Sequence, residues 1–240
     1  MFSTQRNSDM WKPGEVMKAK LVDRPNRFLG RVELDGKVEE AFIPNPGRMY
    51  ELMIPGKTVF VRHKLGKHRK TRLDMIAVKH QGVLISIDSN LPNRFIRGLL
   101  ESRRLDMFSG YDTVKPEPRM FDGRFDFKLT GRNGVTLIEV KSCTLVLDGN
   151  ARFPDAPTVR GARHMRHLAA SLQSGVASRA AVVFVIQRPD AKVFSPNDKT
   201  DPGFGDALRY AYSQGVEIIP LSTEIRNWFP SLIGVIPFKL

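Results

Sequence analysis

The sequence contains a single cysteine, Cys143, among 240 residues. One thiol excludes an internal disulfide and is typical of a protein in a reducing compartment. No apolar run is long enough for a membrane-spanning helix, and residues 1–10 lack the apolar stretch of a secretory signal peptide. These absences favour a cytoplasmic protein that does not act at a membrane.

Acidic residues are also few relative to basic ones. The chain has 25 Asp and Glu against 38 Lys and Arg, which gives a net charge of +13 and an isoelectric point near 10.1. On charge alone, this excess suggests a polyanionic partner such as nucleic acid or an acidic membrane surface, although a generally basic proteome would produce the same bias.

The chain divides at the polar stretch 88–93, which contains a proline. Before it, apolar patterns predict strands over residues 16–22, 28–34, 38–43, 58–62, 73–78 and 83–87, with a short helix over residues 46–52. Three strands, a helix and two strands is the order of an OB-fold barrel, with the sixth strand left over. We therefore expect an OB-fold-like nucleic-acid-binding domain over residues 1–88.

A basic loop joins the fourth and fifth of these strands. Its six cationic residues are Arg62, Lys64, Lys67, Arg69, Lys70 and Arg72. They could neutralise several phosphates of a nucleic acid, and a solvated loop is the alternative. Phe28, Phe42 and Phe60 could stack on bases but could equally belong to the core, so base-specific recognition is not predicted.

Residues 89–240 predict an α/β domain. The first helix is expected over residues 94–105, with Asn93 as its N-cap. Strands over 111–117, 123–129 and 135–141 follow, then a helix from the N-cap Thr158 to about residue 174, a buried parallel strand over 180–186, a helix over 206–214 and a strand over 216–220. Helix, three strands, helix, strand is the order of a restriction-endonuclease-like core.

Two of these strands, residues 123–129 and 135–141, flank the turn-forming residues 130–134 and predict a hairpin. A two-residue loop, 133–134, would place Asp126 opposite Lys141, whereas a four-residue loop, 131–134, would place it opposite Glu139. In both registers Asp126, Glu139 and Lys141 share one face because strand side chains alternate. The other face would be apolar, with Phe125, Phe127, Ile138 and Val140.

This arrangement suggests a metal site. Two carboxylates about 5 Å apart repel each other unless a cation lies between them, although a solvated charge cluster is the alternative. Magnesium binds one or two carboxylates and completes its shell with water and phosphate. Asp126 and Glu139 are the candidate ligands for Mg²⁺ or Mn²⁺, and Lys141 would orient water or stabilise charge on a phosphodiester. The pattern resembles the PD-(D/E)xK nuclease core.

The helix that follows Thr158 has a basic face. Arg160, Arg163, His164 and His167 occur at i, i+3, i+4 and i+7 and so line one side. This side could contact DNA or the scissile phosphate, and simple solvent exposure is the alternative. Zinc binding is not expected, because His164 and His167 have no cysteine or acidic ligand nearby in sequence.

Short strings across residues 14–220 carry a further signal. They are residues 27–29, 44–49, 55–56 and 92–94 in the first part, and 124–127, 138–145, 153–156, 158–164 and 194–196 in the second. Together they resemble the sugar fermentation stimulation protein A family. That resemblance implies an OB-like domain, a nuclease-like domain, and DNA binding linked in bacteria to the expression of sugar-utilisation genes.

The resemblance also assigns roles to residues. Asp126, Glu139 and Lys141 match the family's nuclease-like motif, although Phe125 stands where its proline would be. Similar sequences carry an acidic residue near the position of Gly98, and the nearest carboxylate here is Glu101. We expect a DNA-binding protein with a Mg-dependent phosphodiesterase site. A non-catalytic DNA-binding regulator and an RNA-binding or RNA-processing protein are the alternatives, and the oligomeric state stays open, a homodimer included.

Overall fold

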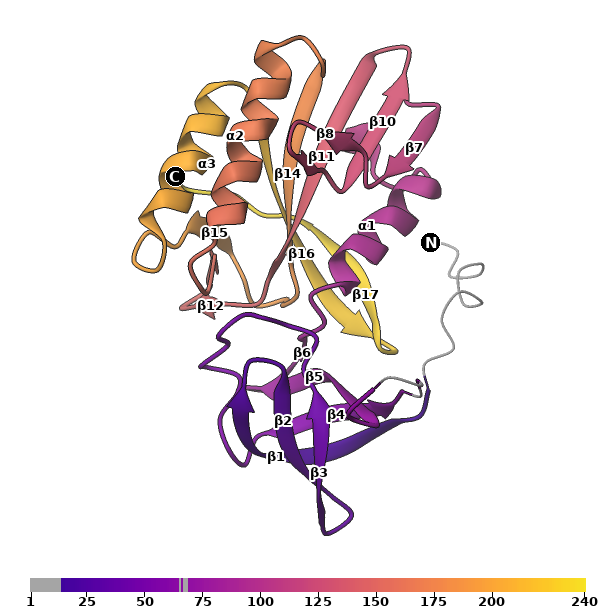
Figure 1. The fold of residues 1–240 in the computed structure, drawn as a ribbon, viewed down its shortest axis with the longest axis vertical. Coiled ribbons are helices and arrows are strands. Elements are labelled where there is room, and N and C mark those ends of the chain that lie inside the picture. The colour runs from indigo at the N-terminus through magenta and orange to yellow at the C-terminus, as the bar shows by residue number, and fades with distance from the viewer. Residues whose placement is uncertain (1–13, 65, 67–68) are drawn as a thin grey trace. The chain divides into compact units, whose positions relative to one another are not determined.

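The computed structural model describes residues 14–64, 66 and 69–240, and the chain divides into two compact units (Figure 1). The first unit ends at Asp88 and excludes Gly47–Met49, which belong with Ser89–Leu240 to the second. Among the described residues, no helix combines the length and the apolar character needed to cross a membrane.

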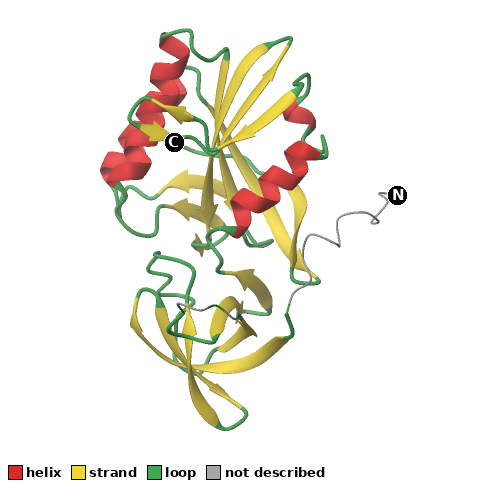
Figure 2. Cartoon of the chain, turned by 45° about the vertical axis from the view of Figure 1, so that its right-hand side comes forward, coloured by secondary structure: helices red, strands yellow, loops and turns green. Residues whose placement is uncertain are grey.

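The first unit is a barrel. Its strands are β1 (Val16–Asn26), β2 (Leu29–Leu34), β3 (Lys37–Phe42), β4 (Thr58–His63), β5 (Leu73–His80) and β6 (Val83–Ser86), in the sheet order β3-β2-β1-β4-β5-β6. A parallel pairing of β3 with β5 closes the first five strands on themselves. This is the connectivity of an OB fold, as predicted, and β6 extends the sheet beyond it. Figure 2 shows the described part of this unit as strands and loops.

The short helix expected over residues 46–52 is wrong, because the segment forms bends and turns. Met49 has a φ of 49°, a left-handed conformation that a right-handed helix cannot contain. Its backbone N–H donates to Asp155 Oδ2 at 3.2 Å instead of to a helical carbonyl.

The second unit is a sheet covered by helices on both faces (Figures 1 and 2). The strand order is β17-β16-β14-β11-β10-β7, in which β11, β14 and β16 run parallel. One apolar cluster joins the sheet to α2 and α3, and a second joins its other face to α1. The element bounds are α1 Leu91–Glu101, a 3₁₀ turn Asp106–Phe108, β7 Thr113–Pro116, β8 Arg119–Met120, β9 Gly123–Arg124, β10 Phe127–Gly131, β11 Gly134–Cys143, β12 Val146–Leu147, β13 Asn150–Phe153, α2 Val159–Gln173, β14 Arg179–Ile186, β15 Val193–Pro196, α3 Pro202–Ser213, β16 Glu217–Arg226 and β17 Phe229–Val235.

Most predicted elements are present in the predicted order. The helix after Thr158 is confirmed together with its cap, since Thr158 Oγ1 accepts from the Gly161 N–H at 3.0 Å. The buried strand β14 is confirmed as parallel to both neighbours. A Cβ on Gly161 would lie only 2.7 Å from the Thr158 side chain, so the tight cap explains this glycine.

Other elements differ from the prediction. The first helix begins at Leu91 with Asn90 as its N-cap, so Asn93 lies inside the helix and does not cap it. Pro92 explains the earlier start, because proline suits the first helical turn. The last helix also begins earlier, at Pro202, and strands β8, β12, β13, β15 and β17 were not predicted.

The starts of α2 and α3 depend on one side chain, Asp201. Its Oδ1 accepts from the Phe204 N–H at 3.0 Å, which caps α3, and its Oδ2 accepts from the Thr158 N–H at 2.7 Å, next to the start of α2. Asp201→Ala should therefore lower the free energy of unfolding by about 2 kcal/mol, the sum of a lost cap and a lost charged hydrogen bond.

Chemical denaturation of the purified protein measures this loss. Asp206→Ala is the matched control, because Asp206 is an exposed carboxylate of the same helix and its removal should change stability by less than about 0.5 kcal/mol. Equal effects of the two substitutions would contradict the role of Asp201.

Candidate functional site

The hairpin of β10 and β11 positions the predicted motif. Phe127 pairs with Ile138 and Gly131 pairs with Gly134, so the loop consists of residues 132–133. This register is the one predicted for a four-residue loop. The loop itself is two residues shorter, because Gly131 and Gly134 still pair with each other. If the ladder continued one residue further, Asp126 would stand opposite Glu139.

The ladder does not continue, because the chain bends just before β10. Phe125 packs into the cluster beneath α2, whereas Phe127 packs into the cluster beneath α1. The expectation that these two rings share a face with Ile138 and Val140 is therefore wrong for Phe125. Asp126 lies at this bend, where β10 separates from β11.

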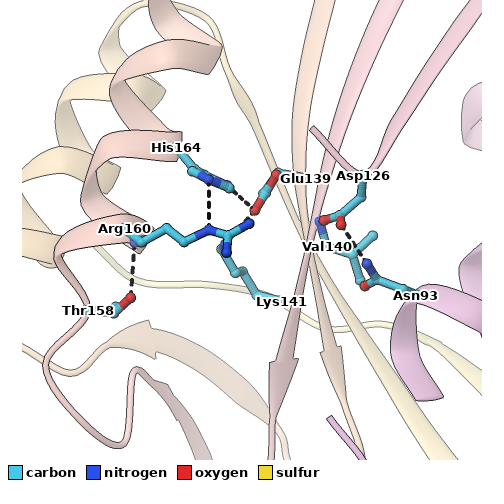
Figure 3. Close-up of polar contacts among 9 residues, drawn as sticks. Asn93, Asp126, Glu139, Val140, Lys141, Thr158, Arg160 and His164 are labelled. Atoms are coloured by element: carbon cyan, nitrogen blue, oxygen red, sulfur yellow. Dashed lines mark hydrogen bonds and ion pairs between the residues drawn. The ribbon is translucent and has the colours of Figure 1, made fainter. Parts of the chain in front are cut away.

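The Asp126 carboxylate bridges β11 and α1 (Figure 3). Its Oδ2 accepts from the Val140 N–H at 2.7 Å, and its Oδ1 accepts from Asn93 Nδ2 at 2.5 Å. The carboxylate thus satisfies a backbone donor of β11 next to the point where the two strands separate. Asn93, interpreted from the sequence as a helix cap, is instead a partner of the candidate ligand.

Glu139 lies in a buried chain of polar contacts with α2 (Figure 3). Only 3% of its surface is exposed. Its Oε1 accepts from Lys141 Nζ at 2.5 Å and also contacts His164 Nδ1, and Arg160 Nε donates to His164 Nε2 at 3.3 Å. Because Nε2 accepts a hydrogen bond, the proton of a neutral His164 lies on Nδ1 and is donated to Glu139.

The second oxygen of Glu139 has different surroundings. Oε2 is buried and has no hydrogen-bond partner among the described residues. A buried acceptor without a partner costs about 1–3 kcal/mol, and more when it is charged. This oxygen is therefore available to a ligand.

The two carboxyl groups have opposite pKa shifts. Burial, together with the nearby Glu139 charge, raises the pKa of Asp126 to about 6, and the Val140 N–H, Lys141 and Asn93 offset this only in part. Burial also opposes ionisation of Glu139, but Lys141 and His164 outweigh it and lower the pKa of that carboxyl. Below about pH 6 Glu139 is therefore the charged group of the pair, and Asp126 ionises as well when the pH rises above that value.

The oxygen atoms at this edge fit a hard divalent cation. Within residues 14–64, 66 and 69–240 Glu139 Oε2 has no hydrogen-bond partner, and the Asp126 carboxylate lies beside the same strand. No group of three or more His, Cys, Asp or Glu side chains placed to hold a metal occurs among the described residues. Two carboxylates with the remaining positions left to water and phosphate is the pattern that suits magnesium.

Glu101 does not belong to this site. It pairs with Arg97 Nε at 2.6 Å on the exposed surface of α1. Eight residues, or about 12 Å of helix, separate it from Asn93, the residue of α1 that contacts Asp126.

The basic face predicted on α2 is divided between two environments. His164 is buried, with 4% of its surface exposed, so solvent exposure is wrong for this residue. Arg160 and Arg163 are exposed, and Arg163 lies 3.6 Å from Asp122, which also contacts His167. The sequence placed His164 on the same side of α2 as Arg160, but it did not indicate that His164 contacts Glu139.

The basic loop of the barrel is also divided. Arg69 forms an ion pair with the buried Asp74, and Lys64 Nζ lies 3.4 Å from the same carboxylate. Lys70 and Arg72 are exposed and Arg62 is half-buried. Lys67 lies outside the described residues.

Comparison with known proteins covers most of the chain. The family model described as sugar fermentation stimulation protein RE domain matches residues 90–228, and the model described as SfsA N-terminal OB domain matches residues 22–87. These matches agree with the predicted fold class and with the family resemblance.

Individual relatives are similar over nearly their whole length. A sugar fermentation stimulation protein homolog of Desulforamulus reducens is 42% identical over 226 residues, which cover 94% of this chain and 93% of the relative. One from Acetivibrio thermocellus is 44% identical over 207 residues, or 86% and 88% of the two chains. The solved structure of Pyrococcus furiosus SfsA in complex with Ca²⁺ is 30% identical, with a TM-score of 0.86 over 94% of this chain and 96% of that one.

The raised pKa of Asp126 predicts a pH-dependent stability in metal-free protein. Between about pH 4 and 6 the folded state holds a proton that the unfolded state has lost, so the contribution of Asp126 to stability falls as pH rises through this window. Asp126→Asn removes this loss of stability. The Asn93 amide can rotate so that its oxygen accepts a hydrogen bond from the new amide group at position 126.

We expect the stability of Asp126→Asn relative to wild type to rise by about 2 kcal/mol between pH 4.5 and 7.5. Urea unfolding at each pH in the presence of chelator measures the difference. A difference that does not change with pH would show that Asp126 is not held in its protonated form by burial.

Proposed function

The chain belongs to the sugar fermentation stimulation protein family, and we propose that it is a DNA-binding protein with a divalent-metal-dependent phosphodiesterase site. The observation that carries the proposal is the buried Glu139 Oε2, which has no hydrogen-bond partner in the described part of the chain and lies close to a second carboxylate, Asp126. A cluster of charges that served the fold alone would satisfy both oxygens of a buried, ionised carboxylate.

A divalent cation accounts for both unusual carboxyl groups. It would take the free oxygen of Glu139, and its charge would favour the ionised form of Asp126 over the protonated form that burial favours. We propose Mg²⁺ or Mn²⁺ as the working ion, because two protein carboxylates leave room for water and phosphate. The Pyrococcus furiosus relative, which was solved in complex with Ca²⁺, supports a divalent ion in this fold.

When bound, the ion would polarise a phosphodiester and lower the pKa of a coordinated water. The side chains of the protein have separate tasks. Lys141, of which 14% is exposed, can donate to the attacking water or to the phosphate oxygens as their charge increases. His164 holds Glu139 Oε1 through its Nδ1 proton and so leaves Oε2 to the ion.

Exposed cations would provide the affinity for DNA. Arg160 and Arg163 flank the site on α2, and Lys70 and Arg72 extend from the barrel loop. Contacts from such side chains to phosphates position the nucleic acid without reading its sequence. We therefore propose binding that depends strongly on salt and little on base sequence.

Metal binding can be tested separately from catalysis. Thermal unfolding with and without Mg²⁺, Mn²⁺ or Ca²⁺ should show stabilisation of the wild type by about 2.7 kcal/mol when the ion is at a hundred times its dissociation constant. Glu139→Gln should lose most of the metal-induced shift, because it replaces the charged ligand with an amide of the same size.

Glu101→Gln is the matched control, since Glu101 is an exposed carboxylate of the same unit paired with Arg97. It should keep the full shift. Equal shifts in wild type and Glu139→Gln would place the ion elsewhere.

Cleavage tests the proposed activity directly. Single-stranded, double-stranded and branched DNA, and RNA, are incubated with the protein in Mg²⁺ or Mn²⁺ and in chelator. We expect metal-dependent cleavage that Glu139→Ala abolishes and that Lys141→Ala slows by about 100-fold or more, the cost of losing a group that stabilises developing charge. Glu101→Ala should cleave like wild type.

Each alternative has its own outcome. Binding without cleavage on every substrate would favour a non-catalytic DNA-binding regulator. Cleavage or tight binding confined to RNA would favour an RNA-processing protein, because contacts to the 2′-hydroxyl distinguish the two nucleic acids.

A further inference from the structure

Closure of the barrel places a buried carboxylate beside an aromatic ring. Phe42, the last residue of β3, pairs in parallel with Asp74 of β5. Asp74 is 3% exposed, and its charge is balanced by the ion pair with Arg69 and by Lys64 Nζ at 3.4 Å. The ion pair thus anchors one side chain of the basic loop next to Phe42.

Arg69 and Phe28 both contact the Phe42 ring. The guanidinium carbon of Arg69 lies 5.7 Å from the centroid of that ring. The Phe28 ring is nearly parallel to it, with an interplanar angle of 12° and 6.3 Å between centroids. Phe28 lies at the turn between β1 and β2, where its N–H donates to Asn26 Oδ1 at 2.9 Å and its carbonyl accepts from the Ile43 N–H.

Phe28 is too exposed to belong to the core. About half of it, 49%, is accessible, whereas core residues of the barrel such as Val32 and Ile43 are fully buried. A single exposed aromatic ring is common on protein surfaces. The Phe28 ring differs because it stacks on the Phe42 ring, which is also in contact with the Arg69 guanidinium. Arg27 beside it and Lys70 and Arg72 of the loop are exposed cations of the same barrel.

We propose that Phe28, Phe42 and Arg69 form a stacking platform for an unpaired nucleobase, so that the barrel binds single-stranded nucleic acid. A flat ring accepts any base, and nearby cations neutralise the phosphates on either side of it. In a duplex the faces of the bases are already stacked on each other, so the platform selects unpaired bases. The turn before β2 and the loop between the fourth and fifth strands are also where OB folds in general bind oligonucleotides.

The charge of the surroundings favours this occupant over a second copy of the chain. A protein with a net charge of +13 repels itself, and its cations beside the ring match a chain of phosphates. The inference rests on the proposed function in one respect only, which is that the partner is a nucleic acid. The platform residues and the carboxylate site lie in different units, so the two can be tested separately.

Fluorescence anisotropy tests the platform, with one labelled oligonucleotide as a single strand and as a blunt duplex, at fixed salt and in chelator to prevent cleavage. Phe28→Ala should bind the single strand about ten-fold more weakly or worse, because one stacked base contributes about that much to affinity. Its affinity for the duplex should change less than about two-fold, since duplex binding rests on phosphate contacts.

Two further variants make the readout specific. Phe28→Trp keeps a ring and should retain binding, whereas Phe28→Leu keeps only the apolar bulk and should resemble Phe28→Ala. Phe229→Ala removes a partly exposed ring of the second unit and should leave binding unchanged. A 2-aminopurine base in the strand should be quenched by wild type and not by Phe28→Ala, because quenching reports direct stacking.

Several outcomes would overturn the platform. They are unchanged binding of the single strand by Phe28→Ala, equal losses on single strand and duplex, and full affinity in Phe28→Leu. Matched deoxythymidine and uridine strands show whether DNA or RNA is preferred. Binding that depends on Phe28 in a protein that never cleaves would overturn only the proposed phosphodiesterase, and cleavage with binding independent of Phe28 would overturn only the platform.

Discussion

A carboxylate as buried as that of Glu139 stays charged only if cations and hydrogen bonds replace the water it has lost. Lys141 comes from the same strand, two residues further on, but His164 comes from α2. The position of α2 on the sheet therefore supplies part of the stabilisation of the Glu139 charge, beside the larger contribution of Lys141. That position in turn depends on the Thr158 cap and on Asp201, which joins the starts of α2 and α3. The candidate site and the helix layer thus depend on the same contacts.

The bend between Phe125 and Phe127 determines where the Asp126 carboxylate lies. It sends one ring beneath each helix layer and separates β10 from β11. The Val140 N–H is then satisfied by the Asp126 side chain, which is drawn into a partly buried position beside Glu139. Burial raises the pKa of Asp126 to about 6, whereas Lys141 and His164 outweigh burial at Glu139 and lower the pKa of that carboxyl. Paired carboxyl groups with divergent pKa values are common at sites that hold ions or move protons.

The two units suit different parts of a nucleic acid. The second unit brings oxygen ligands and a lysine together, a combination suited to the phosphodiester backbone. The first unit holds an exposed ring on a ring-and-guanidinium support, which suits the face of a base. In both units a buried carboxylate fixes a cationic side chain, Asp74 with Arg69 and Glu139 with Lys141. Neither a bound phosphodiester nor a stacked ring would read base identity, in agreement with the sequence, which did not predict base-specific recognition.

By itself the sequence determined the features that depend on neighbours along the chain. These are the strand order of the barrel, the capped helix after Thr158, the parallel strand β14 and the hairpin that carries Glu139 and Lys141, because periodicity, capping and turn chemistry act over a few residues. Only the tertiary structure decided the contacts of Asp126 with Asn93, 33 residues away, and of Glu139 with His164, 25 residues away. It also decided the bend at Phe125 and the left-handed Met49 that prevents a helix. Those features follow from how helices pack on a sheet, and local patterns do not encode that packing.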